Sequence, residues 1–391
     1  MQAAHNRRAL ARLGGLVALW LLAGACAAPA AQSRAPAAQS SAAQSPAAQA
    51  AAAAPAPAAA PGGTAPAAAT GAPTLADVRL PSPVTVHMGY TPLTSGGPVF
   101  VGLERGYFEE LNVILDMVRF NSGALMIAPL ANGDLDAGTG GTSPGLYNAL
   151  LRDVRLKVVS DNGSSRPGGG TSISLVRKDL WDSGAVRSPQ DLRGRRVSFA
   201  TEGSPIDYMM RNLLDQNSMT MEDMDVQRLT SADALVGLQN RAVDVATAAE
   251  PFPTQIDNMG VAVKWLADGD VVPGFQISTI MYSEKFATQT PVARAFMVAY
   301  VRAVREWLAA DSGRADDGMV AAISKWTTVP ADQIRQANAP YIKPDSRVDV
   351  DDMNKQQDFW IRHGVMREKV DLTPFVDQSY VDYANSVLGP R

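Results

Sequence analysis

The residues best placed to do chemistry in this chain are three helix starts, each formed by a small residue and a proline. They are Gly97-Pro98, Ser143-Pro144 and Ser204-Pro205, and each follows a predicted strand. Serine is a favourable N-cap, and proline suits the first helical position. The first N–H groups of a helix have no partner within it, and the helix dipole is positive there. We therefore expect anion sites at these starts, although each serine could instead only cap its own helix.

The segment from Arg195 to Pro251 predicts the fold class. It reads as strand, glycine loop, helix, strand, helix and strand. Its first helix follows Ser204 and carries one apolar stripe, formed by Ile206, Met209, Met210, Leu213 and Leu214. Alternating strands and helices predict an α/β fold with mostly parallel sheets that are flanked by helices. Sheets of this kind bind ligands at the carboxyl ends of their strands.

A second series of strands and helices precedes this segment. The predicted strands are 84–88, 112–120, 135–138 and 156–160, and 172–177 leads onward. The predicted helices between them are 98–104, 124–131 and 144–151. After 278–283, another strand, the chain is mainly helical, and we interpret that region as scaffold. Its predicted helices are 291–309, 316–327, 331–339, 350–363 and 371–388.

Composition excludes several classes of protein. The 391 residues are 46% hydrophobic, which permits two compact lobes, and a net charge of -4 does not suggest nucleic-acid binding. One cysteine and three histidines exclude an internal disulfide and a Cys/His zinc site. We expect no metal and no cofactor.

The N-terminus predicts export and a membrane anchor. Residues 1–25 read as a signal peptide of the lipoprotein type, with a basic start and an apolar run that ends at Ala23-Gly24-Ala25-Cys26. We expect lipid on Cys26; ordinary cleavage at the Ala-x-Ala site is the alternative. Arg7-Arg8 leaves open whether export is by the Sec or the twin-arginine route. Residues 26–82 are rich in Ala, Pro, Gln and Ser and predict a disordered tether.

Four segments carry a resemblance to a known family. They are PVFVGLERGYFEELNV (98–113), ANGDLDAGTGG (131–141), DLRGRRVSFATEGS (191–204) and NRAVDVATAAEP (240–251). In this order and spacing they resemble the periplasmic solute-binding proteins of ABC transporters, in the SsuA/THI5-like group. The resemblance covers nearly everything after about Val84. Gly102, Asn112 and Asn240-Arg241 depart from the family pattern at packing or turn positions.

The resemblance implies a two-lobed periplasmic-binding-protein fold of type II, with the ligand cleft between the lobes. It places lobe one at 83–175 and again at 281–391, where the C-terminal helices lie, and lobe two at 176–280. The hinge crossings are then expected near Ser174–Arg177 and Phe275–Met281. It also implies a monomer that works with an ABC permease and its ATPase at the outer face of the cytoplasmic membrane.

Ligand-binding residues are expected in the loops at the strand ends. The first choices are Tyr90, Thr91, Gly140, Gly141, Thr142, Gly203, Ser204 and Glu250; Asp161, Asn162, Phe252 and Arg166 are further candidates. We expect the helix starts at Gly141–Pro144 and Gly203–Pro205 to face each other across the cleft and hold one ligand. Glu250 could accept an N–H of the ligand, or it could cap a helix or pair with an arginine.

The expected ligand is a small organic anion of the sulfonate, nitrate or carboxylate type. A thiamine-precursor pyrimidine or another aromatic heterocycle is the alternative, since Tyr90, Phe252 and Glu250 could clamp a ring. A ligand-sensing role is a third possibility that the sequence does not separate from transport. The least favoured alternative is a pyrimidine-synthesis enzyme that resembles these binders in fold. We expect no catalysis, because neither His87 nor His363 falls in a strand-end loop and the sole cysteine lies in the leader.

Overall fold

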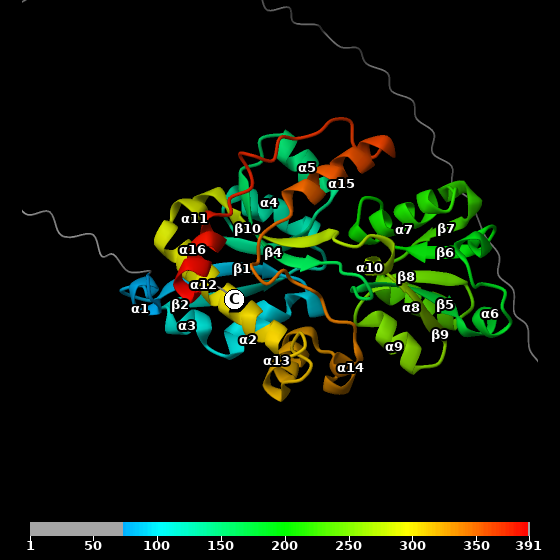
Figure 1. Ribbon diagram of the computed structural model, residues 1–391, viewed down its shortest axis with the longest axis horizontal. Coiled ribbons are helices and arrows are strands. Elements are labelled where there is room, and N and C mark those ends of the chain that lie inside the picture. Colours follow the sequence, from blue (N-terminus) through cyan, green and yellow to red (C-terminus); the bar gives the residue numbers. More distant parts are fainter. Residues whose placement is uncertain (1–72, 390–391) are drawn as a thin grey trace, which may run out of the picture. The chain divides into compact units, whose positions relative to one another are not determined.

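The computed structural model describes residues 73–389, which lie within one compact unit of the chain, 68–391. The predicted signal peptide (1–25), the lipidation site Cys26 and most of the predicted tether lie outside the described residues. The described residues form two five-stranded sheets, and each sheet is flanked by helices (Figure 1). We call the part built on the first sheet lobe one and the part built on the second sheet lobe two.

The sheet of lobe one has the strand order β2-β1-β3-β10-β4. Strand β1 runs parallel to both β2 and β3, whereas β10 runs antiparallel to β3 and β4. The strands are β1 (Val84–Tyr90), β2 (Val113–Arg119), β3 (Ala137–Gly141), β4 (Leu156–Ser164) and β10 (Gln276–Ser283).

The sheet of lobe two repeats this arrangement in the order β7-β6-β8-β5-β9. Strand β6 is parallel to β7 and β8, and β5 is antiparallel to β8 and β9. The strands are β5 (Ser172–Arg177), β6 (Arg196–Phe199), β7 (Asp225–Arg228), β8 (Val245–Ala249) and β9 (Ala262–Ala267).

Both sheets are mostly parallel, as the sequence predicted: four of the five strands in each run in one direction, and one strand runs against them. The antiparallel strand in each sheet is the one that the chain enters from the other lobe: β5 follows the strands of lobe one, and β10 follows those of lobe two. A strand that arrives from the other lobe starts at the edge where the parallel strands end. It therefore runs in the opposite direction to them.

Helices cover both faces of each sheet. Lobe one carries α1 (Leu75–Val78), α2 (Gly97–Glu104), α3 (Tyr107–Glu110), α4 (Ile127–Asn132) and α5 (Pro144–Leu151). After the return to lobe one come α11 (Glu284–Thr288), α12 (Thr290–Ala309), α13 (Asp317–Thr327), α14 (Ala331–Gln336), α15 (Val350–Arg362) and α16 (Ser379–Leu388). Lobe two carries α6 (Lys178–Asp182), α7 (Pro205–Gln216), α8 (Ser231–Gln239), α9 (Phe252–Asn258) and α10 (Asp268–Val271).

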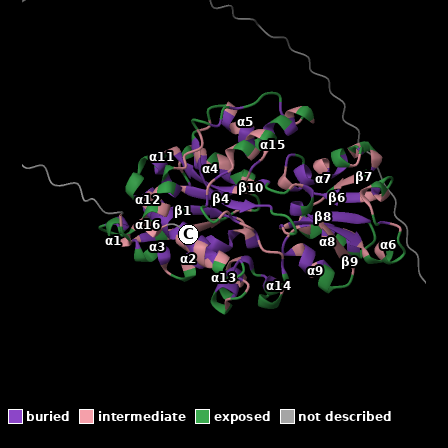
Figure 2. Cartoon of the chain, viewed as in Figure 1, coloured by how far each residue is buried: buried purple, intermediate pink, exposed green. Residues whose placement is uncertain are grey.

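Figure 2 shows where the buried residues lie along the chain, and their side chains form separate cores on the faces of the sheets. In lobe one, α12 packs on one face, and α4, α5 and α15 pack on the other. In lobe two, the apolar stripe of α7 packs on one face, and α8 and α9 pack on the other. All five residues of the predicted stripe, Ile206 to Leu214, are buried.

The crossings between lobes lie at slightly different residues from those predicted. Strand β5 lies wholly in the second sheet and β10 wholly in the first. The crossings are therefore the segments 165–171 and 268–275, a few residues before the predicted hinge positions. The predicted lobe boundaries at 175 and 280 fall inside β5 and β10.

The folded part also begins earlier than the predicted end of the tether at residue 82. Helix α1 starts at Leu75, and Val78 and Leu80 are each only 6% exposed in the core of lobe one. The Leu80 N–H donates to the Leu111 carbonyl at 3.2 Å. The Asn112 side chain also donates to the Leu80 carbonyl at 2.6 Å, so both apolar and polar contacts hold this stretch.

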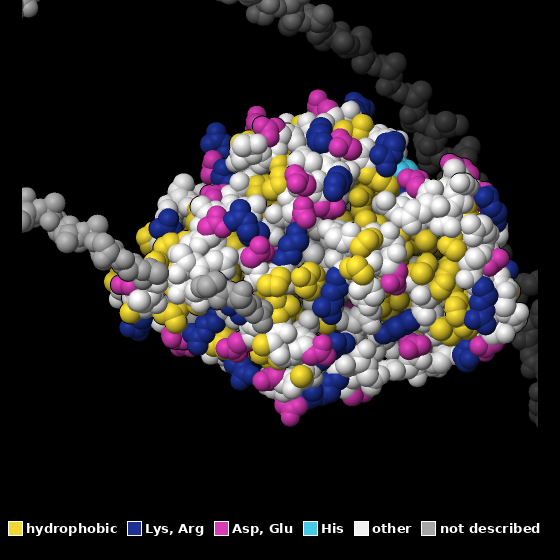
Figure 3. All heavy atoms as spheres, viewed as in Figure 1, with side chains coloured by type: hydrophobic (Ala, Val, Ile, Leu, Met, Phe, Trp, Pro, Cys, Tyr) yellow, Lys and Arg dark blue, Asp and Glu magenta, His cyan; other side chains and the backbone are white. Residues whose placement is uncertain are grey.

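Within residues 73–389, none of the helices is both long and apolar enough to cross a membrane. In the same range, no three His, Cys, Asp or Glu side chains are grouped so that they could hold a metal ion. On the face seen in Figure 3, basic and acidic side chains are interspersed.

Candidate ligand-binding site

The starts of helices α5 and α7 meet across the two lobes, as the sequence predicted. A side chain added at Gly203, before α7, would lie 3.2 Å from the Pro144 ring at the start of α5. A side chain added at Gly141 would lie 3.1 Å from Cγ of Pro205, the first residue of α7. Each proline thus packs against a glycine of the opposite lobe. A side chain at either glycine would press on the facing proline by a few tenths of an ångström, and Gly203 also has a left-handed φ of 77° that favours glycine.

Both serines cap their helices. The Ser143 hydroxyl accepts the Leu146 N–H at 3.3 Å, and the Ser204 hydroxyl accepts the Asp207 N–H at 3.2 Å. The structure therefore bears out the capping role that the sequence left open for these serines. Capping satisfies one amide at each start and leaves the direction of the helix dipole unchanged.

The start of α7 already holds a carboxylate. Asp207, in the first turn, is fully buried and accepts the Gly203 N–H at 3.0 Å. It also pairs with Arg211 at 3.0 Å and with Arg228 at 2.9 Å. The Gly203 amide, predicted to be free for a ligand, is therefore occupied by the protein. The first turn of α5 has no acidic residue, so α5 is the better anion site of the two.

The glycines predicted as a loop before α5 belong to a strand. Gly140 and Gly141 are the last residues of β3 and pair with Thr279 and Ser278 of β10. Thr142 is 1% exposed. Its hydroxyl donates to the Gln276 carbonyl at 2.5 Å, and its N–H donates to the Ile277 carbonyl at 3.1 Å. Thr142 therefore ties β3 to β10, and its hydroxyl is not free for a ligand.

Asp161 and Asn162 were predicted in a polar loop, but they are buried in the last part of β4. Asp161 accepts the Gly163 N–H at 2.8 Å, the Gln276 amide at 2.7 Å and the Lys343 N–H at 2.7 Å. Burial raises the pKa of Asp161, and these hydrogen bonds oppose the shift. Asn162 accepts the Tyr300 hydroxyl at 3.2 Å.

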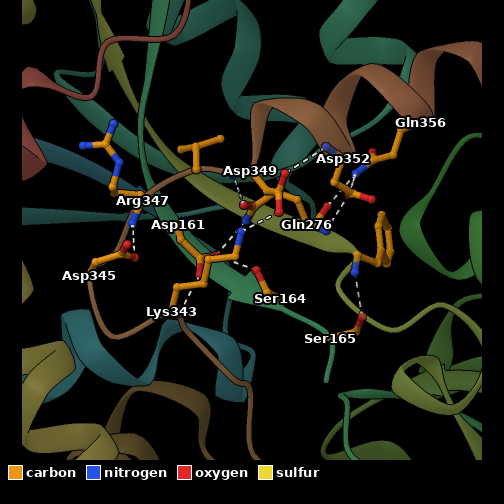
Figure 4. Close-up of polar contacts among 12 residues, drawn as sticks. Asp161, Ser164, Ser165, Gln276, Lys343, Asp345, Arg347, Asp349, Asp352 and Gln356 are labelled. Carbon is orange, nitrogen blue, oxygen red and sulfur yellow. Dashed lines mark hydrogen bonds and ion pairs between the residues drawn. The ribbon is translucent and has the colours of Figure 1, made fainter. Parts of the chain in front are cut away.

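Figure 4 shows Asp161 within a larger buried network around Gln276. The Gln276 N–H donates to Asp352 of α15 at 2.8 Å, and its carbonyl accepts the Gln356 side chain at 2.9 Å. Its side-chain oxygen accepts the Asp349 N–H at 3.0 Å. This network attaches the first residue of β10 to β4 and to the C-terminal segment. Asp161 is therefore a structural carboxylate that anchors the return into lobe one.

Glu250 is buried directly after β8 and is held by four contacts within the protein. It accepts the Thr254 N–H at 3.2 Å and the Thr254 hydroxyl at 2.9 Å. Lys264 lies 3.1 Å away, and the Asn338 N–H of lobe one donates to it at 3.0 Å. Of the roles predicted for Glu250, capping is thus realised, and its ion-pair partner is Lys264, not an arginine. The bond to Asn338 adds a link between the lobes that the sequence did not indicate.

Tyr90 ends β1 and sits in an aromatic cluster. Its ring meets Phe100 at 5.6 Å and Trp326 at 5.5 Å, both edge to face, and it is 8% exposed. Thr91 is half-buried directly after it. Phe252 begins α9 and packs beside a core of lobe two, and the Arg166 guanidinium lies 5.3 Å from the Tyr341 ring centre. These four residues stay candidates.

Sequence reasoning missed a second contact between the lobes. Tyr208 of α7 is 5% exposed and packs in a core of lobe one, not in that of its own lobe. Its ring lies 4.6 Å from that of Phe275 and 4.5 Å from that of Phe359. Burial raises its pKa to about 12. About two helical turns after Tyr208, the Asp215 carboxylate of α7 lies 2.9 Å from the His363 ring of lobe one. The apolar stripe could not reveal this, because Tyr208 lies beside it on the helix.

The sequence of this chain is similar to those of known solute-binding proteins. The sequence model of the NMT1-like family matches residues 80–323, more than half of the chain. The bicarbonate-binding protein CmpA from Synechococcus sp. is 20% identical over 268 residues, which cover 63% of this chain and 58% of CmpA. The nitrate/nitrite binding protein NrtA from Nostoc sp. is 21% identical over 286 residues, 70% of this chain and 63% of that protein. The chain thus spans well under the full length of these relatives.

Solved structures share the fold. The alkanesulfonate-binding protein SsuA from Xanthomonas axonopodis pv. citri, bound to MOPS, superposes with a TM-score of 0.60 at 19% identity. That alignment covers 76% of this chain and 100% of SsuA. The periplasmic nitrate-binding protein NrtA from Synechocystis superposes with a TM-score of 0.64 at 14% identity, covering 78% and 88% of the two chains. The predicted two-lobed periplasmic-binding-protein fold is thereby confirmed.

Proposed function

Since this chain belongs to the NMT1-like family, we propose that it is an extracytoplasmic solute-binding protein that delivers a small organic anion to an ABC import permease. The observation that carries the proposal is the meeting of the α5 and α7 starts across the lobes, with Pro144 on Gly203 and Pro205 on Gly141. Two helix starts that touch in a closed form can separate to admit a ligand, and their dipoles favour an anion.

We place the anion at the start of α5. This start has a positive dipole end and no carboxylate in its first turn, whereas Asp207 fills the start of α7. Gly141, Gly203 and Ser204 then shape the site from both lobes, and Tyr90 with Thr91 borders it at the end of β1. The names of the relatives support this ligand class, since bicarbonate, nitrate and alkanesulfonates are all small anions.

A pyrimidine or another aromatic heterocycle is the second candidate ligand. The Tyr90 ring, with Phe100 and Trp326 beside it, favours this alternative, because aromatic faces stack on flat ligands. A ligand-sensing role would use the same site, and the genes beside the coding sequence would separate sensing from transport.

The export signal and the anchor belong to the same proposal. Lipid on Cys26 would hold the protein on the outer face of the cytoplasmic membrane, near the permease and its ATPase. For a flexible chain of about 50 residues, a span of ~5–6 Å × √n gives a reach of roughly 40 Å. We expect the protein to act as a monomer.

A thermal-shift screen tests the function. The purified protein is heated with taurine, a longer alkanesulfonate, nitrate, bicarbonate, benzoate and an aminopyrimidine, each at millimolar concentration. A ligand present at a hundredfold excess over its Kd stabilises the folded state by about 2.7 kcal/mol. Stabilisation by the aminopyrimidine alone would favour the second candidate. If none of the six compounds raises the melting temperature, the proposed ligand classes are wrong.

A further inference from the structure

The two crossings between the lobes lie side by side and are bonded to each other. The Ser165 N–H donates to the Phe275 carbonyl at 2.8 Å, and the Gly269 N–H donates to the Gly169 carbonyl at 3.0 Å. The Ser165 hydroxyl also accepts the Phe275 N–H at 2.9 Å. Any rotation of one lobe against the other must bend or break this pair of segments.

Asp268 is buried where the return crossing begins. It is 1% exposed, and its Oδ2 accepts the N–H of Ser172, the first residue of β5, at 3.0 Å. Its other oxygen, Oδ1, is buried and has no hydrogen-bond partner within the described residues. Oδ1 fills the place that a side chain at Gly170 would take, and Gly170 has a φ of 143°. The first crossing therefore needs a glycine there to make room for the carboxyl group.

A buried carboxyl group with one unpartnered oxygen favours its neutral form. Burial raises the pKa of Asp268 to about 6, although hydrogen bonding from Ser172 and from the backbone of Gly269 and Thr171 opposes this. No ion pair joins Asp268 to a cation in the described part of the chain. The ionisable side chains on the neighbouring segments have other contacts: Arg166 with the Tyr341 ring, Lys264 with Glu250, Asp270 with the Ala267 N–H, Arg211 with Asp207 and Glu202, and Asp215 with His363.

We propose that Asp268 is a positioning residue of the hinge that makes closure of the two lobes proton-dependent. In the closed hinge Asp268 is the neutral acid, with its proton on the buried carboxyl group. When the crossings part, the carboxyl group reaches water and releases the proton. Acidic surroundings therefore favour the closed form, and neutral surroundings favour the open form.

The hinge chemistry does not depend on which ligand binds. Its consequence for transport rests on the proposed function: a protein outside the cytoplasmic membrane would retain its ligand longer at acidic pH. The pKa of Asp268 is about 6 in the closed form, against 3.8 for an ordinary aspartate. A difference of that size means that the closed form binds the proton about a hundredfold more tightly.

Hydrogen–deuterium exchange of the purified protein, without ligand, tests the proposal. The amides to follow are those of Ser172, which bonds to Asp268 itself, and Gly269, which bonds to Gly169 across the two crossings. After correction for the intrinsic rate, we expect them to exchange up to about a hundredfold faster at pH 7.5 than at pH 4.5. Asp268→Asn, which imitates the neutral acid, should keep the slow exchange at both pH values.

Asp270→Asn is the matched control. Asp270 lies two residues away and accepts the Ala267 N–H at 2.9 Å, so it caps α10 without touching the first crossing. This variant should keep the pH dependence of the wild type. Equal corrected exchange of both amides at the two pH values in the wild type would overturn the proposal, whether or not Asp268→Asn folds. The same holds if Asp268→Asn retains the full pH dependence. Neither result depends on a ligand, so a failed ligand screen leaves this test intact.

Discussion

Replacing Tyr208 with alanine should uncouple the unfolding of the two lobes. Tyr208 projects from α7 of lobe two into a core of lobe one, where its ring contacts those of Phe275, Phe359 and Trp360 at 4.6, 4.5 and 5.5 Å. We expect the wild type to unfold in one transition, because this contact makes each lobe depend on the other. Without the ring, the lobes should unfold in two separate steps.

The size of the effect follows from burial. Tyr208 is 5% exposed, and truncation of a buried aromatic side chain to alanine costs about 3–5 kcal/mol. A site between two lobes can collapse more easily than a core, so we expect the low end, about 3 kcal/mol. With a urea m-value of about 3 kcal/mol/M, the midpoint of the affected lobe should fall by about 1 M. Tyr208→Phe keeps the ring and should lose no more than about 1 kcal/mol.

The assay is urea unfolding, followed by tryptophan fluorescence and by circular dichroism. Met209→Ala is the matched control, because Met209 is the next residue of α7 but is buried in the core of its own lobe. That variant should lose about 2–5 kcal/mol and still unfold in one transition if α7 remains docked through Tyr208. The reasoning is refuted if Tyr208→Ala loses less than about 1 kcal/mol, or if its two probes still give coincident single transitions.

Four further predictions follow from the same geometry. Gly141→Ala should weaken the ligand found in the thermal-shift screen about 5- to 30-fold, measured by calorimetry, because a methyl group 3.1 Å from the Pro205 ring holds the lobes apart; an unchanged Kd would move the site elsewhere. Asp207→Asn should cost about 3–5 kcal/mol in urea unfolding, because it leaves Arg211 and Arg228 without their buried partner, and a loss under about 1 kcal/mol would show that the pairs contribute little. The pKa of Asp268 is raised from 3.8 to about 6 in the folded protein, so ionisation of this carboxyl group destabilises the fold. The destabilisation is absent below about pH 4 and complete above about pH 6, so over that window the wild type should lose up to about 3 kcal/mol of unfolding free energy relative to Asp268→Asn. Parallel pH profiles of the two proteins would contradict this. Cys26→Ser should move the protein from the membrane fraction to the soluble fraction, and a wild type that is already soluble and free of lipid would contradict the predicted anchor.

The local features of this chain could be predicted from the sequence because they depend on residues close together. The serine caps before α5 and α7, the prolines that follow them and the apolar stripe of α7 all rest on contacts three or four residues apart. Most strands of both sheets were predicted within a few residues, but β9 (Ala262–Ala267) was missed. The four family-like segments supplied the two-lobed arrangement. Strand ends were predicted less well: β3 and β4 run on through residues assigned to loops, because β10 pairs with them from a distant part of the chain.

Which polar groups remain free for a ligand was decided only by the tertiary structure. Glu250, Thr142 and Asp161 look like candidate ligand contacts, but their partners Asn338, Gln276 and Lys343 lie 88, 134 and 182 residues away. A buried polar group must find a partner, and a linear pattern does not show which distant backbone group will reach it. The placement of Tyr208 in the opposite lobe and the unpartnered oxygen of Asp268 have the same origin. Both follow from how two lobes with two crossings close on each other, and burial then sets the energy and the charge state of each group.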